Sequence, residues 1–187
     1  MKEKLWTVSN TLSLSRIVLM LPVIYFFITP GLHHREYAVL CTLLAVTTDA
    51  LDGYFARLLH QESEIGKIVD PLADKIGVGI VVVLLLIFGD IQLWFALLIL
   101  IRDILIFLGG LYVRKRKGIV LPSNMPGKFA VSFVALTLTL AMLQYRMFDF
   151  VESISQAMSC IFLVVSFAFY IRRFQRILTV KDEQPNP

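Results

Sequence analysis

Charged residues are scarce in this sequence. They make up 17% of its 187 residues, while hydrophobic residues make up 57%. A soluble domain carries about a quarter charged residues, so the composition argues against a water-soluble protein. The runs 76–89 and 93–101 contain no charge at all, and apolar segments of about 20 residues are long enough to cross a bilayer. The composition therefore predicts an integral membrane protein.

Cysteine is also rare, because the chain has only Cys41 and Cys160. Both lie inside apolar runs, where a thiol is typical of a small packing residue rather than of a disulfide. The first apolar run ends at Pro30-Gly31 without a small-residue cleavage site, and another apolar run follows. A cleaved signal peptide is therefore not expected.

Six apolar segments separated by turn residues predict an all-α integral membrane protein with six transmembrane helices. The predicted helices cover residues 10–30, 37–58, 70–89, 91–113, 127–146 and 151–174. We predict one membrane domain over residues 1–180. The short tail 181–187, which ends the chain with two prolines, is expected to be disordered.

Lysine and arginine are distributed unevenly over the predicted loops. One side of the membrane would hold most of them, and the other only Arg35 and Arg146. The positive-inside rule then predicts that both termini are cytoplasmic, together with the connection between the second and third helices, in the cell inner (cytoplasmic) membrane. The basic run 114–117 is interpreted as a topogenic cluster that also touches anionic headgroups of membrane lipids. Because the basic residues are spread over separate loops, no nucleic acid is expected as a partner.

Four aspartates flank this cytoplasmic connection: Asp49, Asp52, Asp70 and Asp74. Each pair is three or four residues apart, so its two carboxylates share one helix face. Asp70-Pro71 also resembles a helix start, with Asp70 as the N-cap. The other three aspartates lie in apolar helix, where a carboxylate is costly unless it faces a cavity or a partner.

Converging carboxylates need a cation to remain ionised together. Mg²⁺ or Mn²⁺ is favoured, since hard divalent ions prefer carboxylate oxygens, and His60 is the only nearby ligand that would suit zinc. Two helices with two carboxylates each could hold two ions that clamp phosphoryl oxygens. Gly53 lets a ligand approach the backbone, and Arg57 suits phosphate. The pattern predicts a metal-dependent active site that faces the cytoplasm.

The spacing of these residues resembles a known family. The order Asp49-x2-Asp52-Gly53-x2-Ala56-Arg57-x8-Gly66-x3-Asp70-x3-Asp74 is similar to the complete signature of the CDP-alcohol phosphotransferases. Asn10-x2-Ser13-x2-Arg16 is similar to an N-terminal motif of the same family, Asn-x2-Thr-x2-Arg. The resemblance covers nearly the whole chain. It implies an enzyme of phospholipid biosynthesis that transfers a substituted phosphate from a CDP-linked lipid such as CDP-diacylglycerol to an alcohol and releases CMP.

The resemblance also implies roles for individual residues. Asp49, Asp52, Asp70 and Asp74 match metal ligands, and Asp74 also matches the general base that acts on the acceptor hydroxyl. Positions that contact the CDP-lipid headgroup in relatives correspond to Asn10, Ser13, Gly53, Arg57 and Ser63. A homodimer is a further expectation from the family.

The acceptor alcohol is less well defined by the sequence. Chain length, the stretch 70–75 and Gly127-Lys128 resemble the phosphatidylglycerolphosphate synthases, whose acceptor is glycerol 3-phosphate. Arg102-Asp103 and the stretch 112–114 look more like the CMP-forming cardiolipin synthases, whose acceptor is phosphatidylglycerol. The synthases of the first group also usually have a lysine where this chain has Ala130. We predict glycerol 3-phosphate, with phosphatidylglycerol as the alternative; inositol phosphate and serine are less favoured acceptors.

An anionic acceptor needs a basic pocket, for which Arg102, Lys128 and Arg114 are candidates. Arg102 and Asp103 lie near the middle of an apolar helix, so they form either a structural ion pair or part of the site. A small transporter is the alternative outside enzymes. Transport needs polar groups along a path across the membrane, whereas these aspartates cluster at one depth and no inverted repeat is visible.

Overall fold

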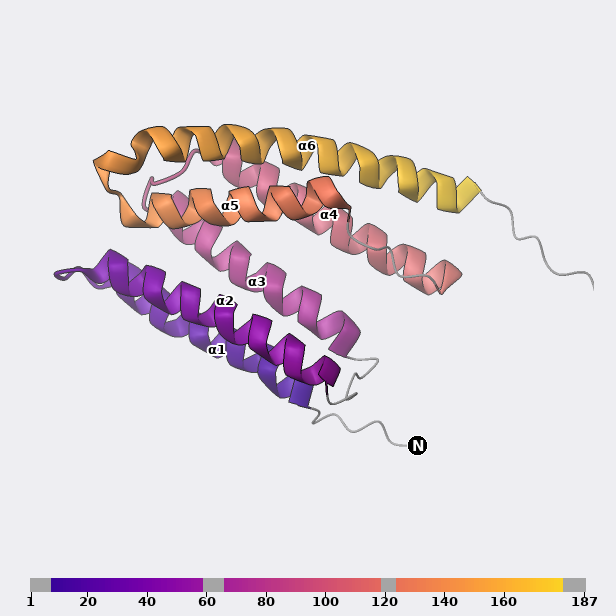
Figure 1. The fold of residues 1–187 in the computed structure, drawn as a ribbon, viewed down its shortest axis with the longest axis horizontal. Helices are drawn as coiled ribbons and strands as arrows, with labels where there is room; N and C mark the ends of the chain where they lie inside the picture. Colours follow the sequence, from indigo (N-terminus) through magenta and orange to yellow (C-terminus); the bar gives the residue numbers. More distant parts are fainter. Residues whose placement is uncertain (1–7, 59–65, 119–123, 180–187) are drawn as a thin grey trace, which may run out of the picture. The chain divides into compact units, whose positions relative to one another are not determined.

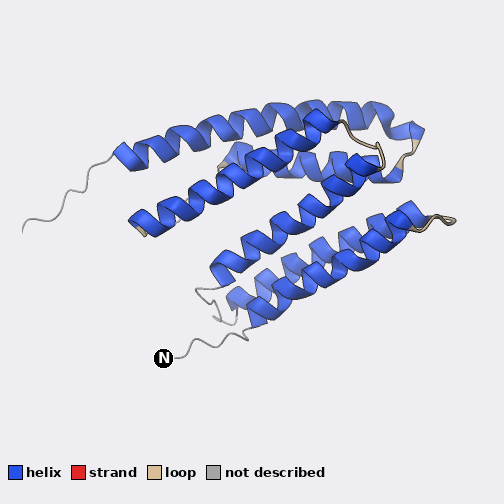
Figure 2. Cartoon of the chain, turned by 180° about the vertical axis from the view of Figure 1, so that it is seen from behind, coloured by secondary structure: helices blue, strands red, loops and turns tan. Residues whose placement is uncertain are grey.

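The computed structural model describes residues 8–58, 66–118 and 124–179. These residues form six α-helices and one short 3₁₀ helix, with no strand among them (Figures 1 and 2). The helices are α1 (Val8–Ile28), α2 (His34–Leu58), α3 (Gly66–Ile87), α4 (Leu93–Lys117), α5 (Met125–Leu143), η1 (Arg146–Phe148) and α6 (Asp149–Thr179). The all-α prediction is confirmed, and each predicted helix has its counterpart.

The start of α3 corrects one interpretation. The helix begins at Gly66, four residues before Asp70, which exceeds the uncertainty of one or two residues at helix ends. Asp70 therefore is not the N-cap, and Pro71 is accommodated inside the helix at the expense of one backbone hydrogen bond. A capping role no longer accounts for Asp70, so all four aspartates lie within helices.

Three of the described helical segments are long and apolar enough to cross a membrane. They are α4, α5 and the stretch Arg146–Ile177, which joins η1 to most of α6. A shorter apolar segment, Val18–Ile28, belongs to α1. Large apolar side chains such as Leu97, Ile101 and Ile104 are exposed on α4, as is typical of helices that meet lipid rather than water.

The chain forms two compact units. The first contains α1, α2, α3 and residues Leu138–Arg146, and the second contains α4, α5 up to Thr137, and α6. The single membrane domain over residues 1–180 stays a prediction, and the tail lies outside the described residues. In the first unit α1 packs against both α2 and α3, with Val23 and Phe27 buried on α1. The small residues Ala38 and Ala45 are buried on α2, and small residues let helices approach closely in a membrane.

The two ends of the first unit carry different polar groups. The start of α1, the end of α2 and the start of α3 lie at one end (Figure 1). At the other, Arg35 Nη1 donates to Asp90 Oδ2 over 2.5 Å, and the two side chains are 13% and 1% exposed. Gln144 also donates to the Asp90 carboxylate. The Arg35 guanidinium lies 4.6 Å from the centre of the Phe27 ring. This ion pair ties α2 to the turn after α3.

Candidate active site

The predicted metal ligands lie on two helix ends of the first unit. Asp49 and Asp52 belong to the last three turns of α2, and Asp70 and Asp74 to the first turns of α3. The backbone brings both helix ends to the same end of the unit (Figure 1). The Asp74 side chain is exposed, whereas the side chains of the other three aspartates lie outside the described residues. The structure therefore shows the shared location and not the distances between carboxylates.

The donor set fits a hard divalent ion, because it consists of carboxylates alone and two helices contribute two each. No group of three His, Cys, Asp or Glu side chains gathers among the side chains that the structure describes. Only Asp74 of the four predicted ligands belongs to that set. The metal site thus stays a prediction, based on the location of the helices and the chemistry of the ligands.

The predicted CDP-lipid contacts fall at the same end of the first unit. Asn10 and Ser13 lie in the first two turns of α1, and Gly53 and Arg57 lie towards the end of α2. Because α1 packs against α2 and α3, these segments are close in the fold, although their side chains are not described. Ser63 lies outside the described residues.

Arg102 is a buried charged residue of the second unit. It lies on α4 and is 9% exposed. Its Nη1 donates to Asp103 Oδ1 over 2.6 Å, and its Nη2 donates to Ser166 Oγ on α6 over 2.8 Å. The buried Nε has no hydrogen-bond partner among the described residues. A guanidinium carries five N–H donors, so the pairing with Asp103 leaves part of its donor capacity unused.

Ser166 links Arg102 to the start of α5. Its hydroxyl donates to Asn124 Oδ1 over 3.1 Å, and Asn124 Nδ2 donates to the Ser166 carbonyl oxygen over 3.2 Å. Asn124 Oδ1 also accepts the backbone N–H of Gly127 over 2.7 Å, so Asn124 is the N-cap of α5. A Cβ at Gly127 would lie 2.5 Å from Asn124 Oδ1 and 3.0 Å from Ser166 Oγ. Only glycine fits there without a shift of its neighbours.

Asn124 and Ser166 were missed in the sequence, although each carried a signal. Asn124 is a good capping residue directly before an apolar run, and Ser166 is a polar residue within one. Arg102, Ser166, Asn124 and Gly127, here called the Arg102 network, join α4, α5 and α6 through buried and half-buried hydrogen bonds. Such a network fixes the guanidinium in one orientation.

Lys128 and Arg114, the other predicted acceptor-binding residues, differ in their position along the chain relative to the Arg102 network. Lys128 follows Gly127 in the first turn of α5, and its side chain is exposed. Arg114 lies twelve residues after Arg102 on α4, which is about 18 Å along a helix. The structure thus brings Lys128 beside the network and leaves Arg114 at a distance from it.

Comparison with known proteins identifies the family. The family model for CDP-alcohol phosphatidyltransferase matches residues 6–171, which cover most of the chain. The chain belongs to the CDP-alcohol phosphatidyltransferase family. This confirms the resemblance seen in the signature residues, and the chain is a CDP-diacylglycerol-dependent phosphatidyltransferase of phospholipid biosynthesis. The family uses a divalent metal ion.

Similar relatives carry names that specify an acceptor. The CDP-diacylglycerol–glycerol-3-phosphate 3-phosphatidyltransferase of Aquifex aeolicus is 35% identical over 87% of this chain and 93% of its own length. The enzyme of the same name from Mycoplasma pneumoniae is 26% identical over 92% of this chain and 89% of its own. A probable phosphatidylglycerophosphate synthase of Mycobacterium tuberculosis is 30% identical over 76% of this chain and 68% of its own.

Proposed function

We propose that this protein transfers the phosphatidyl group of CDP-diacylglycerol to glycerol 3-phosphate and releases CMP. The observation that supports this acceptor is the Arg102 network, where Ser166 holds a buried guanidinium whose Nε has no hydrogen-bond partner among the described residues. Lys128 directly follows Gly127 of the same network. Arginine recognises phosphate through paired N–H donors. The names of the Aquifex and Mycoplasma relatives support the same acceptor.

Asp49, Asp52, Asp70 and Asp74 would hold the metal, which we take to be two Mg²⁺ or Mn²⁺ ions. The bound ions would neutralise the pyrophosphate of the donor and stabilise the charge that develops on the leaving CMP. Their ligands come from two helices whose ends lie together in the first unit (Figure 1). This location supports a shared site.

Asp74 is the general base in this proposal. Its exposed carboxylate in the third turn of α3 takes the proton of the acceptor hydroxyl. The hydroxyl oxygen bonds to the phosphatidyl phosphorus, the bond from that phosphorus to the oxygen shared with CMP breaks, and CMP keeps the electron pair. The proton stays on Asp74 until solvent accepts it.

The predicted substrate contacts are part of the same proposal. Asn10, Ser13, Gly53, Arg57 and Ser63 are proposed to contact the CDP-lipid headgroup. Arg102 and Lys128 are proposed to bind the phosphate of the acceptor, with Arg114 as a more distant contributor.

The membrane arrangement belongs to the same proposal. We infer that all six helices cross the membrane, that both termini and the active site are on the cytoplasmic side, and that the protein forms a homodimer. The three long apolar segments and the shorter one in α1 support the first of these statements for four of the six helices. The lysine and arginine distribution supports the second.

An acceptor assay tests the function. The purified protein receives CDP-diacylglycerol and Mg²⁺ with glycerol 3-phosphate, phosphatidylglycerol, inositol phosphate or serine, and CMP release is measured. We expect the highest kcat/KM with glycerol 3-phosphate; a higher value with phosphatidylglycerol would instead assign the alternative acceptor, which the Arg102-Asp103 sequence favours.

Two further measurements test the site. Asp74→Asn should abolish CMP release while CDP-diacylglycerol still binds, and the charge-matched control Asp149→Asn, at the exposed start of α6, should remain active. EDTA should stop turnover and Mg²⁺ should restore it. Near-normal turnover of Asp74→Asn would refute its role as base, and full activity in EDTA would refute the metal.

A further inference from the structure

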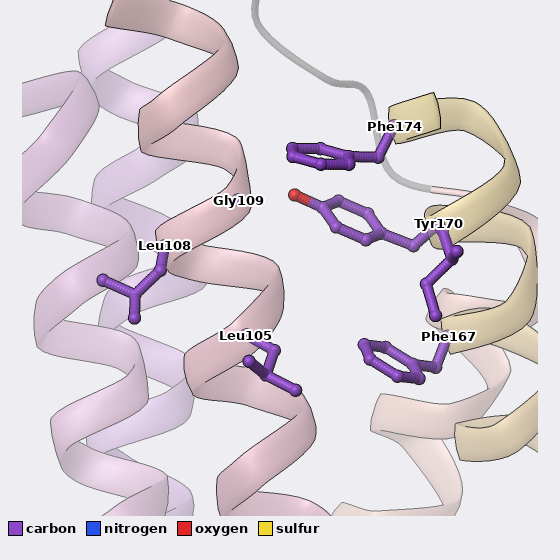
Figure 3. Close-up of a pocket in the computed structure, with 7 residues that line it drawn as sticks. Leu105, Leu108, Gly109, Phe167, Tyr170 and Phe174 are labelled. Carbon is purple, nitrogen blue, oxygen red and sulfur yellow. The ribbon is translucent and has the colours of Figure 1, made fainter. Parts of the chain in front are cut away.

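An apolar groove runs between α4 and α6 in the second unit. Its walls include Leu105, Leu108 and Gly109 of α4 and Phe167, Tyr170 and Phe174 of α6, and it encloses about 280 Å³. Phe167, Tyr170 and Phe174 reach from α6 towards α4 (Figure 3). We call this feature the α4–α6 groove.

The one polar group of the Tyr170 ring is already satisfied. Its hydroxyl donates to the backbone carbonyl oxygen of Ile106 over 3.0 Å. This contact is allowed by Gly109, where a Cβ would lie 2.6 Å from the Tyr170 hydroxyl oxygen (Figure 3). The groove therefore offers carbon surface to a ligand, as a hydrocarbon chain requires.

An aromatic path leads from the groove to a basic side chain. The rings of Tyr170 and Phe174 lie 6.2 Å apart, and so do those of Phe174 and Tyr112. Arg116 Nη1 donates to the Tyr112 hydroxyl over 2.7 Å, and its guanidinium carbon lies 5.9 Å from the centre of the Tyr112 ring. Arg116 is thus held at the end of the path.

The groove and its basic end match the dimensions of one lipid leaflet. Both α4 and α6 are apolar enough to cross a membrane. Basic residues follow the apolar part of each helix: Arg114, Lys115, Arg116 and Lys117 on α4, and Arg172, Arg173 and Arg176 on α6. From Leu105 to Arg116 the helix rises by about 16 Å, which is close to half of the ~30 Å hydrocarbon core.

We propose that the α4–α6 groove binds an anionic phospholipid of the surrounding membrane. One acyl chain lies along Leu105, Gly109 and Phe167, and the phosphate lies at Arg116. The concentration of basic residues at one end distinguishes this groove from a surface that any lipid would cover equally, because each basic side chain near the membrane surface favours anionic lipid. The proposed occupant is a lipid of the bilayer and not the donor substrate, and the experiment below distinguishes the two.

Tryptophan fluorescence in vesicles tests the site. In a Trp6→Phe, Trp94→Phe background, the reporter Phe167→Trp lies in the groove, and Phe169→Trp on the same helix is the matched reporter outside its lining. The protein is placed in phosphatidylcholine vesicles that contain increasing shares of chain-brominated phosphatidylglycerol or chain-brominated phosphatidylcholine. Bromine quenches a tryptophan that it touches.

We expect the Phe167→Trp reporter to favour brominated phosphatidylglycerol by about fivefold, and the Phe169→Trp reporter to show little preference. Arg116→Gln should bring the ratio at position 167 towards one, while Arg146→Gln, a charge-matched change in η1, should leave it unchanged. Helical content by circular dichroism checks folding, and Phe174→Trp serves as a second reporter in the groove.

Three results would overturn the proposal. The first is an equal preference at positions 167 and 169, which would indicate general enrichment of anionic lipid around the protein. The second is a preference that survives Arg116→Gln. The third is displacement of the brominated lipid by unbrominated CDP-diacylglycerol at a much lower share than unbrominated phosphatidylglycerol requires, which would assign the groove to the donor substrate. None of these results depends on which acceptor the enzyme uses.

Discussion

Each unit contains an ion pair with a buried charged group. The two pairs differ in how many of the hydrogen bonds available to that group are formed. In the first unit the Asp90 carboxylate is 1% exposed and receives hydrogen bonds from Arg35 and Gln144, one on each oxygen. In the second unit Arg102 is paired with Asp103 and Ser166, but its buried Nε has no partner in the described part of the chain.

We call the Arg35–Asp90 pair saturated, because both carboxylate oxygens accept a hydrogen bond, and the Arg102–Asp103 pair unsaturated, because one buried donor is unused by the residues that the structure describes. Substitutions in the two pairs should have different effects. Removing one member of a saturated buried pair leaves a charge without compensation, so the loss appears as stability. The buried Nε–H of Arg102, which has no acceptor among the described residues, lowers the stability of the folded protein. A ligand oxygen that accepts a hydrogen bond from this group would restore that stability. The proposed role of Arg102 in acceptor binding rests on this difference, and the variants below test it against a purely structural role of Arg102 and Asp103.

The largest expected effect is on the saturated pair. Arg35→Ala should lower the free energy of unfolding by about 3–5 kcal/mol, because the buried Asp90 carboxylate loses its cation. Denaturant unfolding in detergent measures the change, and CMP release per folded molecule should remain near wild type. The double variant Arg35→Met, Asp90→Leu should recover most of the stability. A folded Arg35→Ala protein without activity would contradict the structural assignment.

A substitution in the unsaturated pair should change the kinetic constants of the enzyme. Arg102→Gln should raise the KM for glycerol 3-phosphate by about 10- to 100-fold, since a hydrogen bond to a charged group contributes about 1.5–3 kcal/mol. The KM for CDP-diacylglycerol should change little. If both KM values rise together, or if only the stability falls, Arg102 is a structural residue and the comparison between the two pairs fails.

Ser166 separates the orientation of Arg102 from its charge. Ser166→Ala removes the acceptor of Arg102 Nη2 and the donor to Asn124, so the KM for glycerol 3-phosphate should rise by about tenfold. The control is Ser159→Ala on the same helix. Ser159 is equally buried but bonds to Thr137 and to its own helix. A similar KM increase in both variants would show that the effect is not specific to the Arg102 network.

The smallest effect concerns a surface pair near Arg35. The Glu36 carboxylate accepts the Tyr145 hydroxyl over 2.6 Å and contacts His33 over 3.0 Å. These hydrogen bonds, that of Tyr145 above all, lower the pKa of Glu36 from 4.5 to about 2. The stabilisation is therefore complete above pH 4.5 and is lost as the pH falls towards 2. The melting temperature should decrease over this range, and Glu36→Gln should decrease less; equal slopes would contradict the assignment.

Much of the fold was predictable because it follows from local properties. Apolar runs of bilayer length predicted six helices, and prolines and glycines marked most of the breaks. The start of α3 was wrong, since Asp70-Pro71 has the local chemistry of a helix start while the helix begins a turn earlier at Gly66. The local sequence Asp70-Pro71 does not reveal that the helix already begins before it.

The site was predictable only in part, for a related reason. The four aspartates could be assigned because their spacing lies within 26 residues and defines a family signature. The partner of Arg102 on α6 lies 64 residues away, and no spacing rule connects two helices over that distance. The choice between a structural ion pair and a site residue stays open, and the sequence could not show that Arg102 Nε is buried without a partner among the described residues.

The close approach of Gly109 to Tyr170 has an evolutionary consequence. A Cβ at position 109 would clash with the Tyr170 hydroxyl oxygen, so a change at one of these positions should be accompanied by a change at the other. Relatives with alanine or a larger residue at the position of Gly109 should carry phenylalanine or a smaller residue in place of Tyr170. Relatives that keep the tyrosine should keep the glycine. Such covariation in an alignment of the family would trace the α4–α6 contact without any further structure.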